Sequence, residues 1–129
     1  MEDLRIKATS TTPKVSLSNN GIMDIQGKSI PDSESDFWSR ISEWFRLYMF
    51  TPAPKTTFNL QIDYLNTSSS KVILHLLYRL NELKERGFEA EVIWFFNEYD
   101  IDMQEVGKDY EHMVNVPFSF KIIQQAVLS

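Results

Sequence analysis

The chain has 129 residues, 43% of them apolar, and a formal net charge of −5 at pH 7. This length is typical of one domain, and we expect residues 1–129 to form a single domain. No cysteine is present, which excludes a disulfide scaffold, cysteine-ligated metal sites and thiol catalysis. No basic stripe, long apolar run or secretory signal is visible. We therefore expect a cytoplasmic protein whose partners include neither nucleic acid nor a membrane.

The N-terminal region alternates apolar and polar residues, a pattern that predicts strands. The first expected strand covers residues 4–8. Two further strands, 15–17 and 22–26, flank Asn20-Gly21, which is a strong turn sequence for a β-hairpin. Gly27 is expected to end the third strand.

The first predicted helix begins near Pro31, where Asp32 or Ser33 can accept hydrogen bonds from the first free amides. Large apolar residues then recur at spacings of three and four and give the helix one buried face: Phe37, Ile41, Trp44, Phe45 and Tyr48. The helix should end near Phe50, because the prolines that follow lack an amide hydrogen and restrict the preceding residue.

The second half of the chain alternates strands with helices. Residues 57–64 form a strand with one apolar and one polar face. A helix over 72–86 follows, with Gly87 as its C-cap, and then strands over 92–96 and 118–122. Strands joined by crossover helices pair in parallel, and the polar face of 57–64 must stay wet. We therefore expect an α/β fold, a mixed sheet with helices packed mainly on one face.

The acidity is concentrated in residues 98–111, which hold six acids and one base, so that the rest of the chain is neutral. This segment could bind a hard cation through carboxylates, but it lacks the spacing of an EF-hand. We favour a loop that leads into a helix with an acidic start, helical in its second part and capped by Asp102. No metal or cofactor is expected.

Nucleophilic catalysis usually needs a histidine base, and the chain has two histidines. His75 lies on the polar side of its helix and should face solvent, and His112 follows the acidic segment without an adjacent partner. The glycines are scattered, which leaves no phosphate-binding loop. We expect no enzymatic activity.

The most informative segment is Asn66–Ser70, an amide and four hydroxyls between a strand and a strong amphipathic helix. A helix cap needs one or two such residues. In a parallel sheet this segment also lies at the carboxyl end of a strand, where ligands and partners bind. A phosphate on one of these hydroxyls would be tolerated by the helix N-terminus and would add about −1.5 to −2 charges. Capping and a phosphorylation switch both fit.

One motif is especially distinctive: Tyr64-Leu65-Asn66-Thr67-Ser68-Ser69-Ser70-Lys71. Four other elements occur with it: Ser29-Ile30-Pro31-Asp32-Ser33 with Phe37-Trp38, Asp100–Met103 with Asp109-Tyr110, Pro117-Phe118, and Thr9 with Thr12-Pro13. Together they make nearly the whole chain resemble the SiaC family of regulatory phosphoproteins. Asp32-Ser33 departs from the Glu-Asn that is more usual in the family, a conservative change at a helix start.

The resemblance implies a fold similar to STAS domains. It also implies that a dedicated protein kinase phosphorylates Thr67 and that a serine/threonine phosphatase removes the phosphate. Asn66, Ser68, Ser69 and Ser70 would form the switch loop around it. The unphosphorylated form would bind and activate a diguanylate cyclase, raise cyclic-di-GMP and favour aggregation or biofilm. Kinase and cyclase would dock around this loop and the helix over 71–86.

Two alternatives remain open. A STAS-like anti-anti-sigma protein would use the same switch residue on a sigma-factor regulator. A small metal-dependent binder or enzyme would be built on residues 98–111, although no catalytic pair or metal-ligand spacing supports it.

Overall fold

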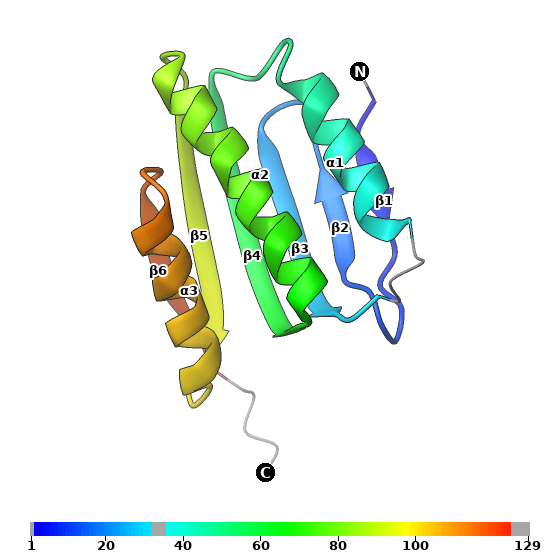
Figure 1. The fold of residues 1–129 in the computed structure, drawn as a ribbon, viewed down its shortest axis with the longest axis vertical. Helices are drawn as coiled ribbons and strands as arrows, with labels where there is room; N and C mark the ends of the chain where they lie inside the picture. The colour runs from blue at the N-terminus through cyan, green and yellow to red at the C-terminus, as the bar shows by residue number, and fades with distance from the viewer. Residues whose placement is uncertain (1, 32–35, 125–129) are drawn as a thin grey trace.

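The structure is a computed structural model that describes residues 2–31 and 36–124. Strands and helices follow one another along this part of the chain (Figure 1). Their bounds are β1 Leu4–Ile6, β2 Lys14–Leu17, β3 Ile22–Ser29, α1 Phe37–Tyr48, β4 Lys55–Leu65, α2 Thr67–Glu85, β5 Glu89–Asn97, α3 Ile101–Met113 and β6 Phe118–Ile123.

The six strands form one sheet whose spatial order is the order of the chain, β1 to β6. The pairs β1–β2 and β2–β3 are antiparallel, and β3–β4, β4–β5 and β5–β6 are parallel. The predicted hairpin turn is confirmed, since Gly21 has a φ of 100° that favours glycine between β2 and β3. Each parallel pair is joined by one helix, as the mixed-sheet prediction requires.

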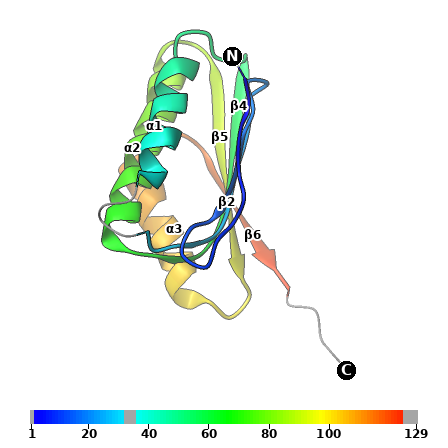
Figure 2. The same ribbon diagram turned by 90° about the vertical axis from the view of Figure 1, so that its right-hand side faces the viewer.

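All three helices lie on one face of the sheet (Figure 2). The alternation along β4 shows why: Phe58, Leu60 and Ile62 are buried beneath the helices. Asn59 and Gln61, between them, point to the opposite face and are partly exposed. The prediction of helices packed on one face and a wet second face is confirmed.

The core lies between the helices and the sheet. Phe45 of α1 stacks on Phe58 of β4 with ring centroids 5.7 Å apart. Trp94 of β5 is fully buried, and its Nε1 donates a hydrogen bond to the Met103 carbonyl at 3.0 Å. A Cβ on Gly107 would lie 2.6 Å from the Trp94 ring. Glycine at this position therefore lets α3 pack directly on the indole.

Several predicted boundaries differ from the structure. Gly27 does not end β3: the strand continues to Ser29 through a register shift between Gly27 and Lys28, and Gly27 has a φ of 127°. The glycine provides an irregularity within the strand instead of a stop. The first strand ends at Ile6 and α1 ends at Tyr48, each about two residues earlier than predicted.

The predicted start of the first helix is only partly described. The helix begins at Phe37, and Asp36 at its N-cap makes no side-chain capping hydrogen bond. The predicted caps Asp32 and Ser33 lie outside the described residues.

Candidate functional site

The predicted switch loop is not a loop. β4 ends at Leu65, Asn66 is the N-cap of α2, and the helix begins at Thr67. Asn66 Oδ1 accepts hydrogen bonds from the Ser69 amide at 3.0 Å and from Ser68 Oγ at 3.1 Å. The capping amide thus organises the first turn, and the helix starts five residues before the apolar stripe from which it was predicted.

Ser69 faces inward and is fully buried. Its Oγ donates to the Ser29 carbonyl at 3.1 Å, lies 2.7 Å from Ser29 Oγ and accepts from Trp38 Nε1 at 3.1 Å. Because the single Ser69 hydroxyl proton goes to the carbonyl, the Ser29 hydroxyl is the donor in the contact between the two Oγ atoms. This buried cluster, which we call the Ser69 node, ties the first turn of α2 to the end of β3 and to α1.

Ser70 anchors the same turn to α3. Tyr110 Oη donates to the Ser70 carbonyl at 2.9 Å and lies 3.0 Å from Ser70 Oγ, which therefore donates to it. Burial of Tyr110 raises the pKa of its phenol, and the hydrogen bond to Ser70 opposes that rise in part. Asn66 adds a further link, since its Nδ2 donates to the Pro31 carbonyl at 3.2 Å.

Thr67 differs from its neighbours. Its side chain is exposed, and its hydroxyl makes no hydrogen bond with a described residue. Ser68 is also exposed, but its hydroxyl is bound to Asn66. The first turn of α2 has no acidic residue, and Lys71 lies one turn further on the same side of the helix. A negative charge added to Thr67 would therefore be stabilised by the helix N-terminus and by the nearby Lys71.

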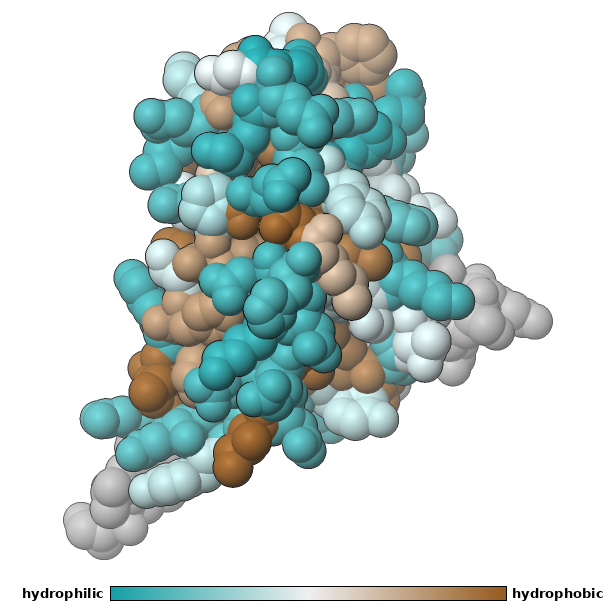
Figure 3. Space-filling view, turned by 60° about the vertical axis from the view of Figure 1, so that its left-hand side comes forward, coloured by the Kyte–Doolittle hydropathy of each residue, from teal (hydrophilic) through white to brown (hydrophobic). Residues whose placement is uncertain are grey.

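Exposed hydrophobic side chains lie at the same end of the sheet as Thr67. Tyr64 near the end of β4 is 58% exposed, Tyr99 after β5 is 88% exposed, and Ile101 at the start of α3 is 67% exposed. Figure 3, viewed from the side of α3 and β6, shows hydrophobic side chains among hydrophilic ones, some of them near this end. Exposed apolar groups at the same end of the sheet as an available hydroxyl are features of a protein-docking surface.

The acidic segment, residues 98–111, is helical from Ile101 onward. The prediction that only the second part of this segment would be helical is therefore wrong. Asp100 caps α3, because its Oδ1 accepts from the Met103 amide at 3.0 Å. The predicted cap, Asp102, instead lies in the first turn. In the described part of the chain no three histidine or carboxylate side chains gather closely enough to hold a metal ion.

Neither histidine lies in a cluster. Both His75 and His112 are exposed, as the sequence predicts for His75. Sequence reasoning missed the anchoring partners Ser29, Trp38 and Tyr110, which come from other elements. Two signals pointed to them: an excess of hydroxyls over what a helix cap needs, and the occurrence of all three residues in the elements that carry the family resemblance. Among residues 2–31 and 36–124, no helix is long and apolar enough to cross a membrane.

The fold and this site define a small α/β domain with an available hydroxyl at a helix start, at the same end of the sheet as exposed apolar side chains. The comparison with known families agrees: the chain belongs to the SiaC family of regulatory phosphoproteins, whose family model matches residues 6–124. An uncharacterised protein of Pseudomonas aeruginosa strain UCBPP-PA14 is 24% identical over 122 residues, covering 94% of this chain and 97% of that protein.

Solved structures share the fold. The crystal structure of apo-SiaC from Pseudomonas aeruginosa matches with a TM-score of 0.86 and 24% identity, over 94% of this chain and 99% of that chain. A chain from the crystal structure of the diguanylate cyclase SiaD in complex with its activator SiaC, also from Pseudomonas aeruginosa, matches with a TM-score of 0.85 and 22% identity, over 94% of this chain and 100% of that chain.

Proposed function

We propose that this protein is a non-catalytic cytoplasmic switch whose phosphorylation on Thr67 decides whether it binds a diguanylate cyclase. In this proposal a protein kinase adds the phosphate and a serine/threonine phosphatase removes it. The unphosphorylated form binds and activates the cyclase, which raises cyclic-di-GMP and favours aggregation or biofilm. Membership of a family of regulatory phosphoproteins supports the modification. The Pseudomonas aeruginosa SiaC described as activator of SiaD supports the choice of target.

The observation that carries the proposal is the difference between Thr67 and the serines of the same turn. The hydroxyls of Ser69 and Ser70 are held in contacts with other elements, and Ser69 is fully buried. A kinase must bring the hydroxyl to the γ-phosphate of ATP. Thr67 can be reached without unfolding the turn, whereas Ser69 cannot. Ser68 is also exposed, but its hydroxyl would first have to break its hydrogen bond to Asn66 Oδ1.

The phosphate would act by charge at a partly apolar surface. Phosphorylation adds about −1.5 to −2 charges at a turn that now has no acidic residue. Tyr64, Tyr99 and Ile101 are exposed at the same end of the sheet, and a partner that covered this end would also bury the phosphate. Desolvating a doubly charged phosphate that has one exposed lysine nearby costs several kcal/mol unless the partner supplies further cations. The modified protein should therefore lose this partner, and arginines on a phosphatase or kinase could still recognise it.

The first test maps the modification. The protein is incubated with ATP and candidate protein kinases of the same organism, and the phosphate is located by mass spectrometry. We expect one phosphate, on Thr67, and no product from the Thr67→Ala variant. Phosphate on another residue, or none at all, would contradict the proposal.

The second test measures binding of the purified cyclase by calorimetry. Thr67→Asp should weaken binding about tenfold or more, because it places a charge in the docking surface, while Thr67→Ala should bind like the wild type. Ser119→Asp is the matched control, since Ser119 is an exposed serine of β6 away from α2. Equal losses for Thr67→Asp and Ser119→Asp would remove the charge mechanism. Retention of a sigma-factor regulator in place of a cyclase would favour the anti-anti-sigma alternative.

A further inference from the structure

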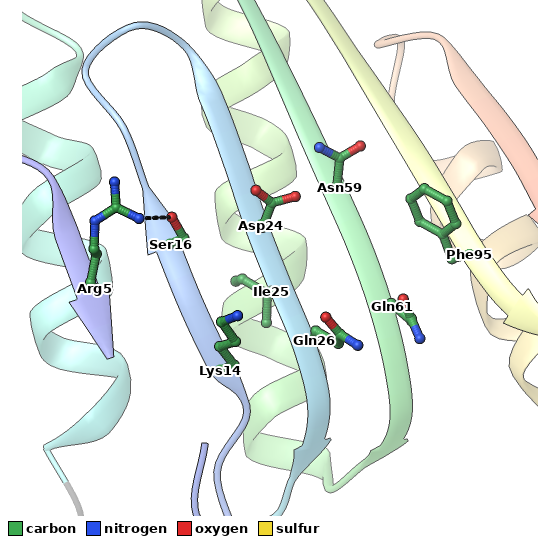
Figure 4. Close-up of a pocket in the computed structure, with 9 residues that line it drawn as sticks. All are labelled: Arg5, Lys14, Ser16, Asp24, Ile25, Gln26, Asn59, Gln61 and Phe95. Atoms are coloured by element: carbon green, nitrogen blue, oxygen red, sulfur yellow. Dashed lines mark hydrogen bonds between the residues drawn. The ribbon is translucent and has the colours of Figure 1, made fainter. Parts of the chain in front are cut away.

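The face of the sheet opposite the helices holds a shallow hollow of about 480 Å³ (Figure 4). Strand register arranges its side chains in a row: Lys14 of β2 is paired with Gln26 of β3, Gln26 with Gln61 of β4, and Gln61 with Phe95 of β5. Side chains at paired positions point to the same face of a sheet. The hollow is therefore set by the strands themselves and does not depend on a loop.

Most polar side chains of the hollow are not used by the protein. They make no hydrogen bond or ion pair with any described residue: Lys14, Asp24, Gln26, Asn59 and Gln61. Each amide offers two donors and one acceptor oxygen, and each charge is available for a ligand. Arg5 and Ser16 are the exceptions, because Arg5 donates to Ser16 Oγ at 3.2 Å; Arg5 also lies 3.6 Å from Asp3.

The charge of this region is opposite to that of the whole protein. Arg5 and Lys14 line both the hollow and a second hollow beside it, which Lys7 also lines. Asp24 is the one acid that lines either of them. Asp3, which lies 3.6 Å from Arg5, adds a second carboxylate at the edge of the region. Three cations then face two carboxylates, so the region is locally positive in a chain with a net charge of −5 and can attract an anion.

The chemistry changes in a fixed order from β1 to β5. Cations on β1 and β2 come first, then Asp24 and Gln26 two residues apart on β3, then the amides of Asn59 and Gln61 on β4, and finally the ring of Phe95 on β5. A nucleotide presents phosphate, ribose and base in the same order. Lysine and arginine bind phosphate, a carboxylate accepts ribose hydroxyls, amides read a base edge, and an aromatic ring stacks on a base.

We propose that this open sheet face binds a ribonucleoside 5′-phosphate, with its phosphate at Arg5 and Lys14 and its base against Phe95. The three strand spacings from β2 to β5 span about 14 Å, comparable to the length of an extended mononucleotide. The hollow is lined by one aromatic residue, which suits a single base and not a run of stacked bases. The site lies on the face away from α2 (Figure 2) and is independent of the Thr67 proposal.

The test is titration of the ¹⁵N-labelled full chain with AMP and GMP, followed by NMR. We expect saturable shifts in the side-chain amide signals of Gln26, Asn59 and Gln61. Lys14→Glu should weaken binding about tenfold or more, because it reverses a charge at the phosphate. Lys108→Glu is the matched control: it makes the same charge change at an exposed position on α3 and should bind like the wild type.

Smaller probes separate the parts of the site. Phe95→Ala should weaken the binding of AMP about fivefold or more, since stacking on the base is lost. It should leave the affinity for ribose 5-phosphate, which has no base, unchanged. Asp24→Ala should reduce the preference for AMP over 2′-deoxy-AMP. The absence of shifts at millimolar AMP would overturn the proposal. So would equal binding of AMP and inorganic phosphate, or equal weakening by Lys14→Glu and Lys108→Glu.

Discussion

Trp94 and Phe95 are neighbours in β5 and show how differently the two faces of the sheet are used. Trp94 is fully buried under α3, with its N–H bonded to the Met103 carbonyl and Gly107 against its ring. Phe95, one residue on, lies on the open face among amides that bind nothing in the protein. The covered face supplies the stability of the fold, so that the open face is free to carry polar side chains that folding does not require.

The first turn of α2 repeats this division within four residues. Ser69 and Ser70 point toward the protein and are bound to other elements. Thr67 and Ser68 point outward, and the Thr67 hydroxyl has no described partner. The turn is thus held rigidly by its inner hydroxyls, while an outer hydroxyl is presented to solvent. A rigid base under an available group favours recognition by a partner, because less ordering is needed on binding.

The largest expected effect is on the covered face. Trp94→Ala should lower the free energy of unfolding by about 3–5 kcal/mol, since it removes a large buried ring and leaves a cavity. Phe95→Ala should lower the free energy of unfolding by about 1 kcal/mol, because the ring lies on the open face and is only partly buried. Urea unfolding followed by circular dichroism measures both. Similar losses for the two variants would mean that the open face contributes to stability as the covered face does.

A middle-sized effect is expected at the Ser69 node. Ser69→Ala leaves Trp38 Nε1 and the Ser29 hydroxyl without a partner in a buried site and should cost about 1–3 kcal/mol. Ser68→Ala removes only an exposed local hydrogen bond and should stay within about 0.5 kcal/mol of the wild type. Both are serine-to-alanine changes in one turn, so helix propensity cancels between them. Equal stabilities would show that the node does not hold the turn.

The smallest effect concerns Tyr110 and pH. Tyr110→Phe should cost about 1 kcal/mol at neutral pH, through the lost hydrogen bonds to Ser70. Burial raises the pKa of Tyr110 in the folded state, so the unfolded chain loses this proton first as pH rises. The contribution of Tyr110 to stability is therefore complete below about pH 10 and is lost above it. Urea unfolding measured across that range should show that the free energy of unfolding falls less steeply with rising pH for Tyr110→Phe than for the wild type. Parallel pH dependences of the two proteins would contradict this.

Much of the fold could be predicted from local patterns. The alternation of Phe58, Leu60 and Ile62 with polar residues specified both a strand and a wet face, because both follow from a period of two. Asn20-Gly21 specified a hairpin turn. The predicted helix from residue 72 missed five residues, because the apolar stripe begins there while the hydrogen-bonded helix begins at its cap, Asn66. Local polarity does not distinguish a capped helical turn from a loop.

The inner half of the site could not be predicted, because it depends on contacts between distant residues. Ser69 lies four residues before Ile73, so the helical period places it on the buried face of α2 once the helix is known to begin at Thr67. Its partners lie 31 and 40 residues away, and no local pattern identifies them. The cap of α3 was uncertain for another reason: Asp100 and Asp102 both suit a helix start, and only the backbone path selects Asp100. The row Lys14, Gln26, Gln61 and Phe95 likewise exists only once strand register is known.

The strand order β1 to β6 has a consequence for how this protein folds. Each strand pairs only with strands adjacent to it in the chain, so no pairing has to wait for a distant segment to arrive. The N-terminal hairpin can form first, and each later crossover closes a loop of moderate length, whose entropy cost grows only slowly with length. Such a sheet can be assembled one segment at a time as the chain leaves the ribosome. A regulator assembled in this way would spend little time with unpaired central strands, which are the species that aggregate.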